Sequence, residues 1–554
     1  MGDEKNDYDA LKAKIDKAET SNKLPFINAH THIFNFDHVN NHFLKGMIPW
    51  WVTVLLSIVF VSIVYLIYFL IIKVCNWGFW QIPVYYVNYL RFLISAFLVI
   101  LFVSFILAPI YFILYISYCQ PSLNWLLKRA YFKKLIVTLR NLIPGRFDML
   151  ERYTNLILHS YDFSENRVKS QKEIFAELQS YYPKHTKFVV LSMDLDYMVN
   201  CNKPNGKTFY DQLQELELLK GQFDEIFPFI HTDPRRLVDK DQNYLDTVKK
   251  YIENGVFNGF KIYPANGYFP FDIRLKPIYD LALKFNLPIT THCSIGPVYY
   301  RGKLSTFRND GYFENGRFIH PFTGNELMGN NGKEFSPHFT HPLNYYCLMN
   351  EPDSLFRYWK KCEKILDFIP EKDYTIDDLK EYRKLKFCLG HFGGSEEWEK
   401  YLNDPWLPSR KNSLTIDEDL IHLSKAKWVH MIKGTDIDKL KPNSWHSIIS
   451  DMIGKKDENG ECYFPYLYSD ISYNLSNDDI LPLLKVRLET DDALSEKILF
   501  GTDFFMVSTK ATERKITMNV RSYLGEDNFK KIAKRNPTNF LASKITDVSK
   551  IINK

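Results

Sequence analysis

Residues 24–32 read LPFINAHTH, an apolar run that ends in two histidines separated by one residue. The run has the length of a buried β-strand, and residues two apart on a strand point to the same side. We therefore expect His30 and His32 to project from one face of a strand, close to its carboxyl end. Both imidazole rings could then reach one common ion.

Seven further apolar runs repeat this pattern along the chain. Helical periodicity separates most of them, for example over residues 244–254 and 275–285. Strands that alternate with helices over eight units predict an α/β fold with parallel strands, the (β/α)8 or TIM barrel. The predicted strands are 24–29, 188–193, 226–230, 259–263, 288–291, 385–389, 466–471 and 498–500.

Polar residues lie where several of these runs end. Lys261 lies in the fourth strand, His292 ends the fifth, His391 ends the sixth, and Asp503 follows the eighth. Barrels of this type carry their catalytic groups at the carboxyl ends of the strands. Neutral imidazoles with one carboxylate suit zinc and leave a position open for water. The sequence therefore predicts a metal centre at this end of the barrel.

Two long stretches, residues 46–72 and 92–127, contain no charged side chain. About 20 apolar residues are enough for a helix to cross the hydrocarbon core. The sequence therefore predicts a two-helix transmembrane hairpin, inserted between strand 1 and helix 1. Basic residues follow the second stretch before any acidic one, which predicts an integral membrane protein with two spans and its barrel on the cytoplasmic side. These residues are Lys128, Arg129, Lys133, Lys134, Arg140 and Arg146.

The predicted organisation has four parts. An N-terminal segment with strand 1 (1–45) precedes the hairpin (46–120) and a basic amphipathic segment (121–147). That segment suits a helix lying on an anionic membrane surface or packed on a domain. The remainder of the barrel (148–554) carries a long insertion between strands 5 and 6, at residues 295–384.

Composition limits the classes of partner. The 554 residues carry 70 basic and 65 acidic side chains, a net charge of +5. This balance argues against a nucleic-acid partner, which would require a basic stripe. A small-molecule substrate and, through the two helices, a lipid bilayer are the expected partners. A homo-oligomer is compatible with the hairpin but is not indicated by any small-residue motif.

The chain resembles the amidohydrolase superfamily, specifically the amidohydrolase-2 branch that includes aminocarboxymuconate-semialdehyde-decarboxylase-like enzymes. The resemblance extends from residue 24 to about residue 543, with the hairpin and other insertions between the matching parts. It depends on INAHTH (27–32), HTDPRR (231–236), GFKIYP (259–264), LPITTHCS (287–294), LKFCLGHFGG (385–394), ILFGTD (498–503) and NPTNFLAS (536–543).

The resemblance implies roles for individual residues. It implies one divalent metal, zinc first and manganese second, with Asp503 also moving a proton and His391 acting on the substrate. Lys261 would bridge two metals as a carbamate or, uncarbamylated, bind a substrate carboxylate or a neighbouring acidic residue. Three arginines and a histidine are candidate substrate contacts, although Asp233 could instead cap a helix beside solvated arginines. The metal ligands are His30, His32, His292 and Asp503, and the substrate candidates are Arg235, Arg236, Arg301 and His320.

Three functions are compatible with these residues. The first is a membrane-anchored metal-dependent hydrolase, in which activated water attacks an amide, ester or lactone bond of a small, carboxylated or amphipathic substrate. The second is a non-oxidative metal-dependent decarboxylase. The third, from a different class, is a membrane-bound sensor or assembly module on a metal-binding barrel, for which the acid–base residue His391 would have no use.

Overall fold

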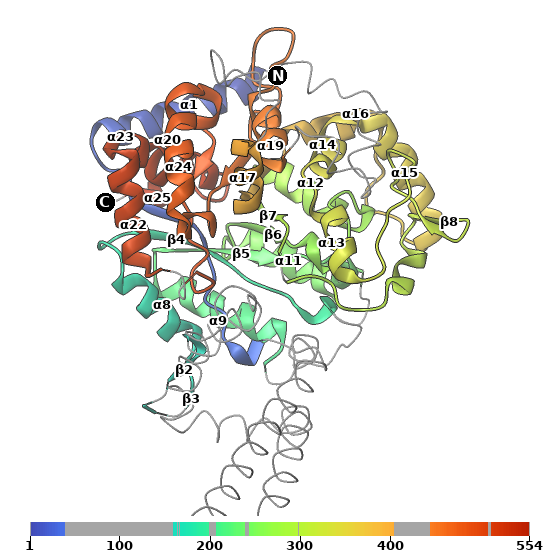
Figure 1. The fold of residues 1–554 in the computed structure, drawn as a ribbon, viewed down its shortest axis with the longest axis horizontal. Helices are drawn as coiled ribbons and strands as arrows, with labels where there is room; N and C mark the ends of the chain where they lie inside the picture. Colours follow the sequence, from blue (N-terminus) through green and yellow to red (C-terminus); the bar gives the residue numbers. More distant parts are fainter. Residues whose placement is uncertain are drawn as a thin grey trace, which may run out of the picture. The chain divides into compact units, whose positions relative to one another are not determined.

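A computed structural model describes residues 2–38, 159–162, 164–165, 167–198, 207–238, 243–296, 298–403, 444–507 and 511–552. Its centre is a sheet of eight parallel strands (Figure 1). They are the eight predicted strands, in the predicted order. In sheet order they are β1 (Ile27–Thr31), β4 (Lys187–Leu191), β5 (Ile226–His231), β6 (Gly259–Ile262), β7 (Pro288–Ser294), β10 (Lys386–Gly393), β11 (Tyr468–Asp470) and β12 (Ile498–Leu499).

The sheet closes into a barrel where the residues that follow β12 lie beside β1. The backbone N–H of Ala29 donates a hydrogen bond to the carbonyl oxygen of Phe500 at 2.9 Å. Thr31 forms a parallel bridge with Phe504. Eight parallel strands in sequential order, with the last beside the first, make a (β/α)8 barrel. The predicted barrel is therefore confirmed.

Helices connect consecutive strands, because parallel neighbours need a crossover connection. The helical patterns expected before the fourth and fifth strands correspond to α11 and α12. Both α8 and α9 begin with a capping box, in which a hydroxyl and a carboxylate bind each other's backbone N–H groups. The bounds are α8 (Gln171–Ser180), α9 (Phe209–Gln222), α10 (Pro234–Leu237), α11 (Tyr244–Glu253) and α12 (Lys276–Phe285).

Helices from both ends of the chain pack together on the barrel. Figure 1 shows α1 (Gly2–Thr20), in blue, beside the red helices α24 (Asn536–Leu541) and α25 (Val548–Ile551). Ile15 and Phe540 belong to one apolar cluster with side chains of β1, β4, β5, β10, β11 and β12. The burial of these side chains stabilises the barrel, at about 25 cal/mol per Å² of apolar surface.

A long connection between β7 and β10 forms its own layer of helices, shown in yellow-green to gold in Figure 1. Aromatic rings pack this layer against the loop after β6, where Phe269 stacks on Phe271 and packs against Phe339 of the connection. Its elements are η5 (Leu304–Asn309), β8 (Phe313–Glu314), β9 (Arg317–Phe318), α13 (Gly332–Thr340), α14 (Leu343–Asn350), α15 (Pro352–Leu366), α16 (Ile376–Lys380) and η6 (Glu381–Lys384).

Further helices follow β10, and short elements occur elsewhere. The helices are α17 (Ser395–Asn403), α19 (Trp445–Gly454), α20 (Leu481–Thr490), α21 (Asp492–Ser495), α22 (Glu513–Leu524) and α23 (Glu526–Lys530). The short elements are β2 (Tyr161–Asp162), β3 (Arg167–Val168), η1 (Phe36–His38), η2 (Asp196–Met198), η3 (Pro264–Asn266), η4 (Ile273–Leu275), η9 (Asn474–Ser476), η10 (Asp478–Ile480) and η11 (Lys531–Arg535).

The predicted membrane localisation is contradicted by the structure. Within the residues described above, no helix combines the length and the apolar character needed to cross a bilayer. The longest of them, α1, has 19 residues and carries charges along its length. The predicted hairpin (46–120) and amphipathic segment (121–147) lie outside the described residues. The prediction of an integral membrane protein with its barrel on the cytoplasmic side was therefore wrong. It relied on uncharged runs that are long enough in the sequence to span a bilayer, but no described helix is both long and apolar enough.

Candidate metal centre

Two histidines and one aspartate meet at the carboxyl ends of β1 and β12. Ligand atoms of His30, His32 and Asp503 all lie within 4.8 Å of one another, and all three residues are buried. Asp503 Oδ1 lies 3.4 Å from His32 Nε2 and 3.7 Å from His30 Nε2. The first and last strands of the barrel thus bring both rings and the carboxylate to one point.

Acceptors behind the two rings fix the proton on each. His32 Nδ1 lies 3.0 Å from the carbonyl oxygen of Leu191, which can only accept a hydrogen bond. His30 Nδ1 lies 2.8 Å from Asp470 Oδ2. Both rings are therefore assigned the Nδ1–H tautomer, with the Nε2 lone pair directed to the carboxylate of Asp503. Backing of this kind is usual for histidines that bind a metal.

The chemistry of this cluster fits a divalent metal ion. His30 Nε2 is buried and has no hydrogen-bond partner among the residues that the structure describes. Such an atom costs free energy unless a ligand satisfies it. Burial, together with His30 and Lys261, lowers the pKa of His32 well below its ordinary value, so His32 is in the neutral form that a metal requires. Two neutral imidazoles and one carboxylate form a known type of catalytic site.

Two glycines permit the close packing around His30. A Cβ atom on Gly501 would lie 2.7 Å from His30 Cβ, closer than side chains can approach. On Gly390, a Cβ atom would lie 2.6 Å from the carbonyl oxygen of Thr291. For steric reasons, only glycine fits at position 501 of the GTD sequence and at position 390 of the LGH sequence.

The backbone at the carboxyl ends of these strands is strained. Asp503, His391 and Tyr473 have φ values of 59°, 66° and 64°, in the left-handed region. Non-glycine residues pay about 1–3 kcal/mol for sparsely populated conformations of this kind, which often occur at active sites. Asp503 follows β12, Tyr473 follows β11, and His391 lies near the carboxyl end of β10. The three strained residues therefore lie at the ends of neighbouring strands.

The predicted ligand His292 makes a different contact. Its Nδ1 lies 3.1 Å from His391 Nε2, and its ligand atoms fall outside the His30–His32–Asp503 group. His391 Nδ1 lies 3.2 Å from the carbonyl oxygen of Ser472, so this nitrogen carries a proton and Nε2 accepts from His292. Burial lowers the pKa of His391 to about 4, although Asp503 opposes the shift. His391 is therefore neutral near pH 7.

Lys261 is buried on β6, and its charged neighbours are Asp470 and Asp503. Burial lowers its pKa to about 8, and Asp470 and Asp503 oppose this shift. No described carboxylate lies within ion-pair distance of its ammonium group. The pKa of Lys261 thus lies close to neutral pH, and its ammonium form could pair with a substrate carboxylate.

Asp470, at the end of β11, is a central residue that the sequence did not indicate. It is fully buried and accepts hydrogen bonds from His30, Ser472 and the backbone N–H of His391. Burial alone would raise the pKa of its carboxyl group, but His30 and Ser472 hold that pKa far below the ordinary value. The available signal was its position, since SDIS follows an apolar run as GTD does.

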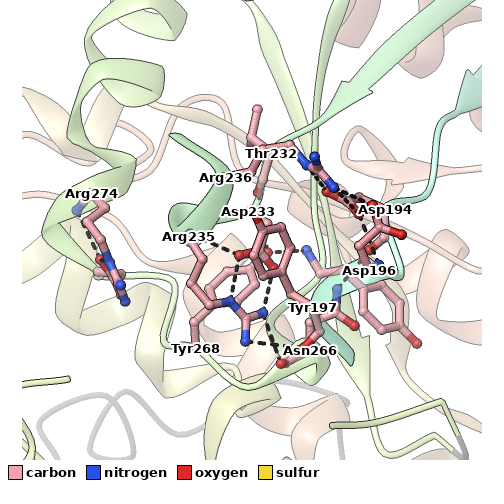
Figure 2. A network of polar contacts seen from close by, with 12 residues as sticks. Asp194, Asp196, Tyr197, Thr232, Asp233, Arg235, Arg236, Asn266, Tyr268 and Arg274 are labelled. Carbon is pink, nitrogen blue, oxygen red and sulfur yellow. Dashed lines mark hydrogen bonds and ion pairs between the residues drawn. The ribbon is translucent and has the colours of Figure 1, made fainter. Parts of the chain in front are cut away.

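Arg235 and Arg236 lie in a separate ion-pair network (Figure 2). Arg235 pairs with Asp233 at 2.6 Å, and Arg236 pairs with Asp194 at 2.5 Å and with Asp196 at 2.6 Å. Asp233 also caps α10, which is one of the two alternatives expected from the sequence. The arginines are not solvated as that alternative assumed, because Arg236 is buried and Arg235 is partly buried and paired with Asp233. These carboxylates already use the donors that were candidates for binding substrate.

The insertion residues Arg301 and His320 are not in the metal-binding group. The backbone N–H of Arg301 donates to the carbonyl oxygen of Met198 at 2.7 Å, and its guanidinium lies over the ring of Tyr299. His320 is fully buried, with Nε2 3.2 Å from Asn344 Oδ1, and burial lowers its pKa to about 3. His320 therefore has the environment of a neutral core histidine.

Comparison with known proteins finds solved structures of low similarity. An uncharacterized TIM-barrel protein from Bordetella bronchiseptica matches 68% of this chain and 84% of its own at 11% identity and a TM-score of 0.29. A "putative amidohydrolase" from Staphylococcus aureus matches 67% of this chain and 91% of its own at 11% identity and a TM-score of 0.30. No family model matches the chain. No curated protein matches it. The barrel assignment therefore depends on the strand order and closure described above.

Proposed function

We propose that this chain is a metal-dependent hydrolase of the amidohydrolase type, acting on an amide, ester or lactone bond of a small molecule. One observation carries the proposal: the Nε2 atoms of His30 and His32 converge on Asp503, while their Nδ1 atoms are held from behind. A site that lies at the carboxyl ends of barrel strands is the usual place for catalysis in this fold. Zinc is the proposed ion because of these ligand types.

Different residues of the site would bind the metal, transfer protons and bind the substrate. His30, His32 and Asp503 would hold the ion, which supplies a Lewis acid and lowers the pKa of a coordinated water. Asp503 is the carboxylate at the centre of the site and can accept a proton. His391 is neutral near pH 7, and its Nε2 lone pair faces His292, so the two rings can pass a proton between them. Lys261 would bind an anionic group of the substrate.

Non-oxidative decarboxylation is the second candidate, and Lys261 is the observation in its favour. A buried ammonium group without a carboxylate partner suits a carboxylated substrate. Such a substrate is compatible with hydrolysis and is required for decarboxylation. The two reactions differ in their products, since only decarboxylation releases carbon dioxide.

A turnover assay with chelation tests the proposal. The protein would be incubated with small amides, esters, lactones and aromatic carboxylic acids, and both bond cleavage and carbon dioxide would be measured. We expect cleavage that a chelator abolishes and added Zn²⁺ restores. Asp503→Asn should lower turnover by about 100-fold or more. Metal-independent cleavage would contradict the proposal, and carbon dioxide release without hydrolysis would replace it with the second candidate.

A further inference from the structure

Asp470 makes hydrogen bonds to both histidine systems of the site. Its Oδ2 holds His30 Nδ1 at 2.8 Å, and its Oδ1 accepts the backbone N–H of His391 at 3.1 Å. The hydroxyl of Ser472 donates to the same Oδ1 and lies 3.0 Å from His391 Nδ1. One carboxylate is thus linked directly to His30 and, through Ser472, to His391.

The donors around Ser472 determine the direction of these hydrogen bonds. An ionised carboxylate only accepts, so the hydroxyl of Ser472 must donate its hydrogen bond to Asp470 Oδ1. The oxygen of Ser472 is then free to accept the Nδ1–H of His391, which the carbonyl oxygen of Ser472 also accepts at 3.2 Å. His391 consequently keeps its Nε2 lone pair directed to His292.

We infer that Asp470 is a positioning residue that sets the tautomer of His30 and, through the hydroxyl of Ser472, helps the Ser472 carbonyl oxygen hold the Nδ1–H of His391. Metal binding through His30 and proton transfer through His391 then depend on one carboxylate that lies behind the His30–His32–Asp503 group. The inference builds on the proposed function for the roles of His30 and His391. The hydrogen-bond directions themselves do not depend on that function.

The isosteric variant Asp470→Asn gives a sharp test, because the backbone fixes how the amide must lie. The N–H groups of His391 and Ser472 point at Oδ1, at 3.1 and 3.0 Å, and only the amide oxygen can accept them. The amide NH₂ must therefore face His30 Nδ1. An NH₂ group only donates, so His30 Nδ1 must accept and its ring proton must move to Nε2. The lone pair that faces Asp503 is then lost.

Zn²⁺ titration of the full chain measures this effect on the metal site. We expect Asp470→Asn to weaken Zn²⁺ binding by about 10–100-fold, the usual effect of removing a partner behind a metal-binding histidine. Ser472→Ala should change Zn²⁺ affinity less than about twofold, yet lower turnover by about tenfold, because Asp470 keeps its contact to His30 while the hydroxyl that joins Asp470 to His391 is lost. Asp367→Asn and Ser180→Ala, at exposed positions, are matched controls and should leave both quantities unchanged.

Nitrogen-15 spectra of the histidine rings, recorded without metal, separate the inference from the proposed function. In the unsubstituted chain, the protonated nitrogen of His30 should be Nδ1, and in Asp470→Asn it should be Nε2. An unchanged His30 tautomer, or Zn²⁺ affinity unchanged in Asp470→Asn, would overturn the inference even if the protein is a hydrolase. If Asp470→Asn does not fold, a Ser472→Ala spectrum without any change in the His391 Nδ1 signal would overturn it instead. Absence of Zn²⁺ binding in the unsubstituted chain would contradict the proposed function, and the ring spectra would still decide the inference.

Discussion

The backbone N–H of Asp503 donates a hydrogen bond to the carbonyl oxygen of His30 at 2.9 Å. The bond joins the end of the last strand to the end of the first. It therefore places the carboxylate next to the HxH pair by the same contact that closes the barrel. Formation of the site and closure of the fold are one structural event.

Gly501→Ala should disturb the site without touching a ligand. The added methyl group would lie 2.7 Å from His30 Cβ, so His30 or the turn before Asp503 must move. We expect Zn²⁺ affinity, measured by titration calorimetry, to fall by at least about tenfold. Gly221→Ala is the control, because a methyl group there meets no atom within 4 Å. Equal Zn²⁺ affinity in both variants would show that the close contact at Gly501 is not needed.

Glu513→Gln should change how stability depends on pH. Burial raises the pKa of Glu513 to about 7, even though Tyr182 and Thr502 donate hydrogen bonds to it. The folded chain then holds this proton more tightly than the unfolded chain does. The free energy of unfolding should therefore fall as pH rises from about 4.5 to about 7, by at most about 3 kcal/mol from this group.

The glutamine variant lacks that proton, so its unfolding free energy relative to the unsubstituted chain should rise over the same pH interval. Urea unfolding at several pH values measures the difference. Glu458→Gln, at an exposed position, provides the control. Parallel pH profiles for the unsubstituted chain and Glu513→Gln would contradict the prediction.

Arg236→Ala should affect stability and leave the metal site intact. Arg236 is the partner of the fully buried carboxylate of Asp194, and the variant would leave that charge unpaired. Loss of one partner from a buried ion pair costs about 3–5 kcal/mol, which urea unfolding would measure. Arg521→Ala, which removes an exposed ion pair with Glu526, should cost less than about 1 kcal/mol. A selective loss of substrate binding at unchanged stability would contradict this prediction and support the substrate role predicted from the sequence.

The strands were predictable because each is a short apolar run with polar residues at its carboxyl end. The same reasoning placed His30, His32 and Asp503 together, since strand ends meet on one side of a parallel barrel. Their role as metal ligands stays a prediction, as does that of His292, which contacts His391 in the structure. Sequence spacing cannot say how far a ring at one strand end lies from another.

The contacts that the sequence could not show come mostly from other parts of the chain. The carboxylates that pair with Arg236 come from the loop after β4, and the substrate role of Arg235 and Arg236 stays a prediction. Asp470 looked like an ordinary residue at a strand end, because its role depends on His30 and Ser472. The membrane prediction used only length and absence of charge, and no described helix meets those criteria.

Metal content tests the central claim most directly. The protein would be purified with Zn²⁺ and dialysed, and bound metal would be measured by mass spectrometry for the unsubstituted chain, His32→Ala, Asp503→Asn and the exposed-histidine control His185→Asn. We predict about one equivalent in the unsubstituted chain and the control, and about a tenth of that or less in the other two. No stoichiometric metal in the unsubstituted chain, or full occupancy in His32→Ala, would contradict the account.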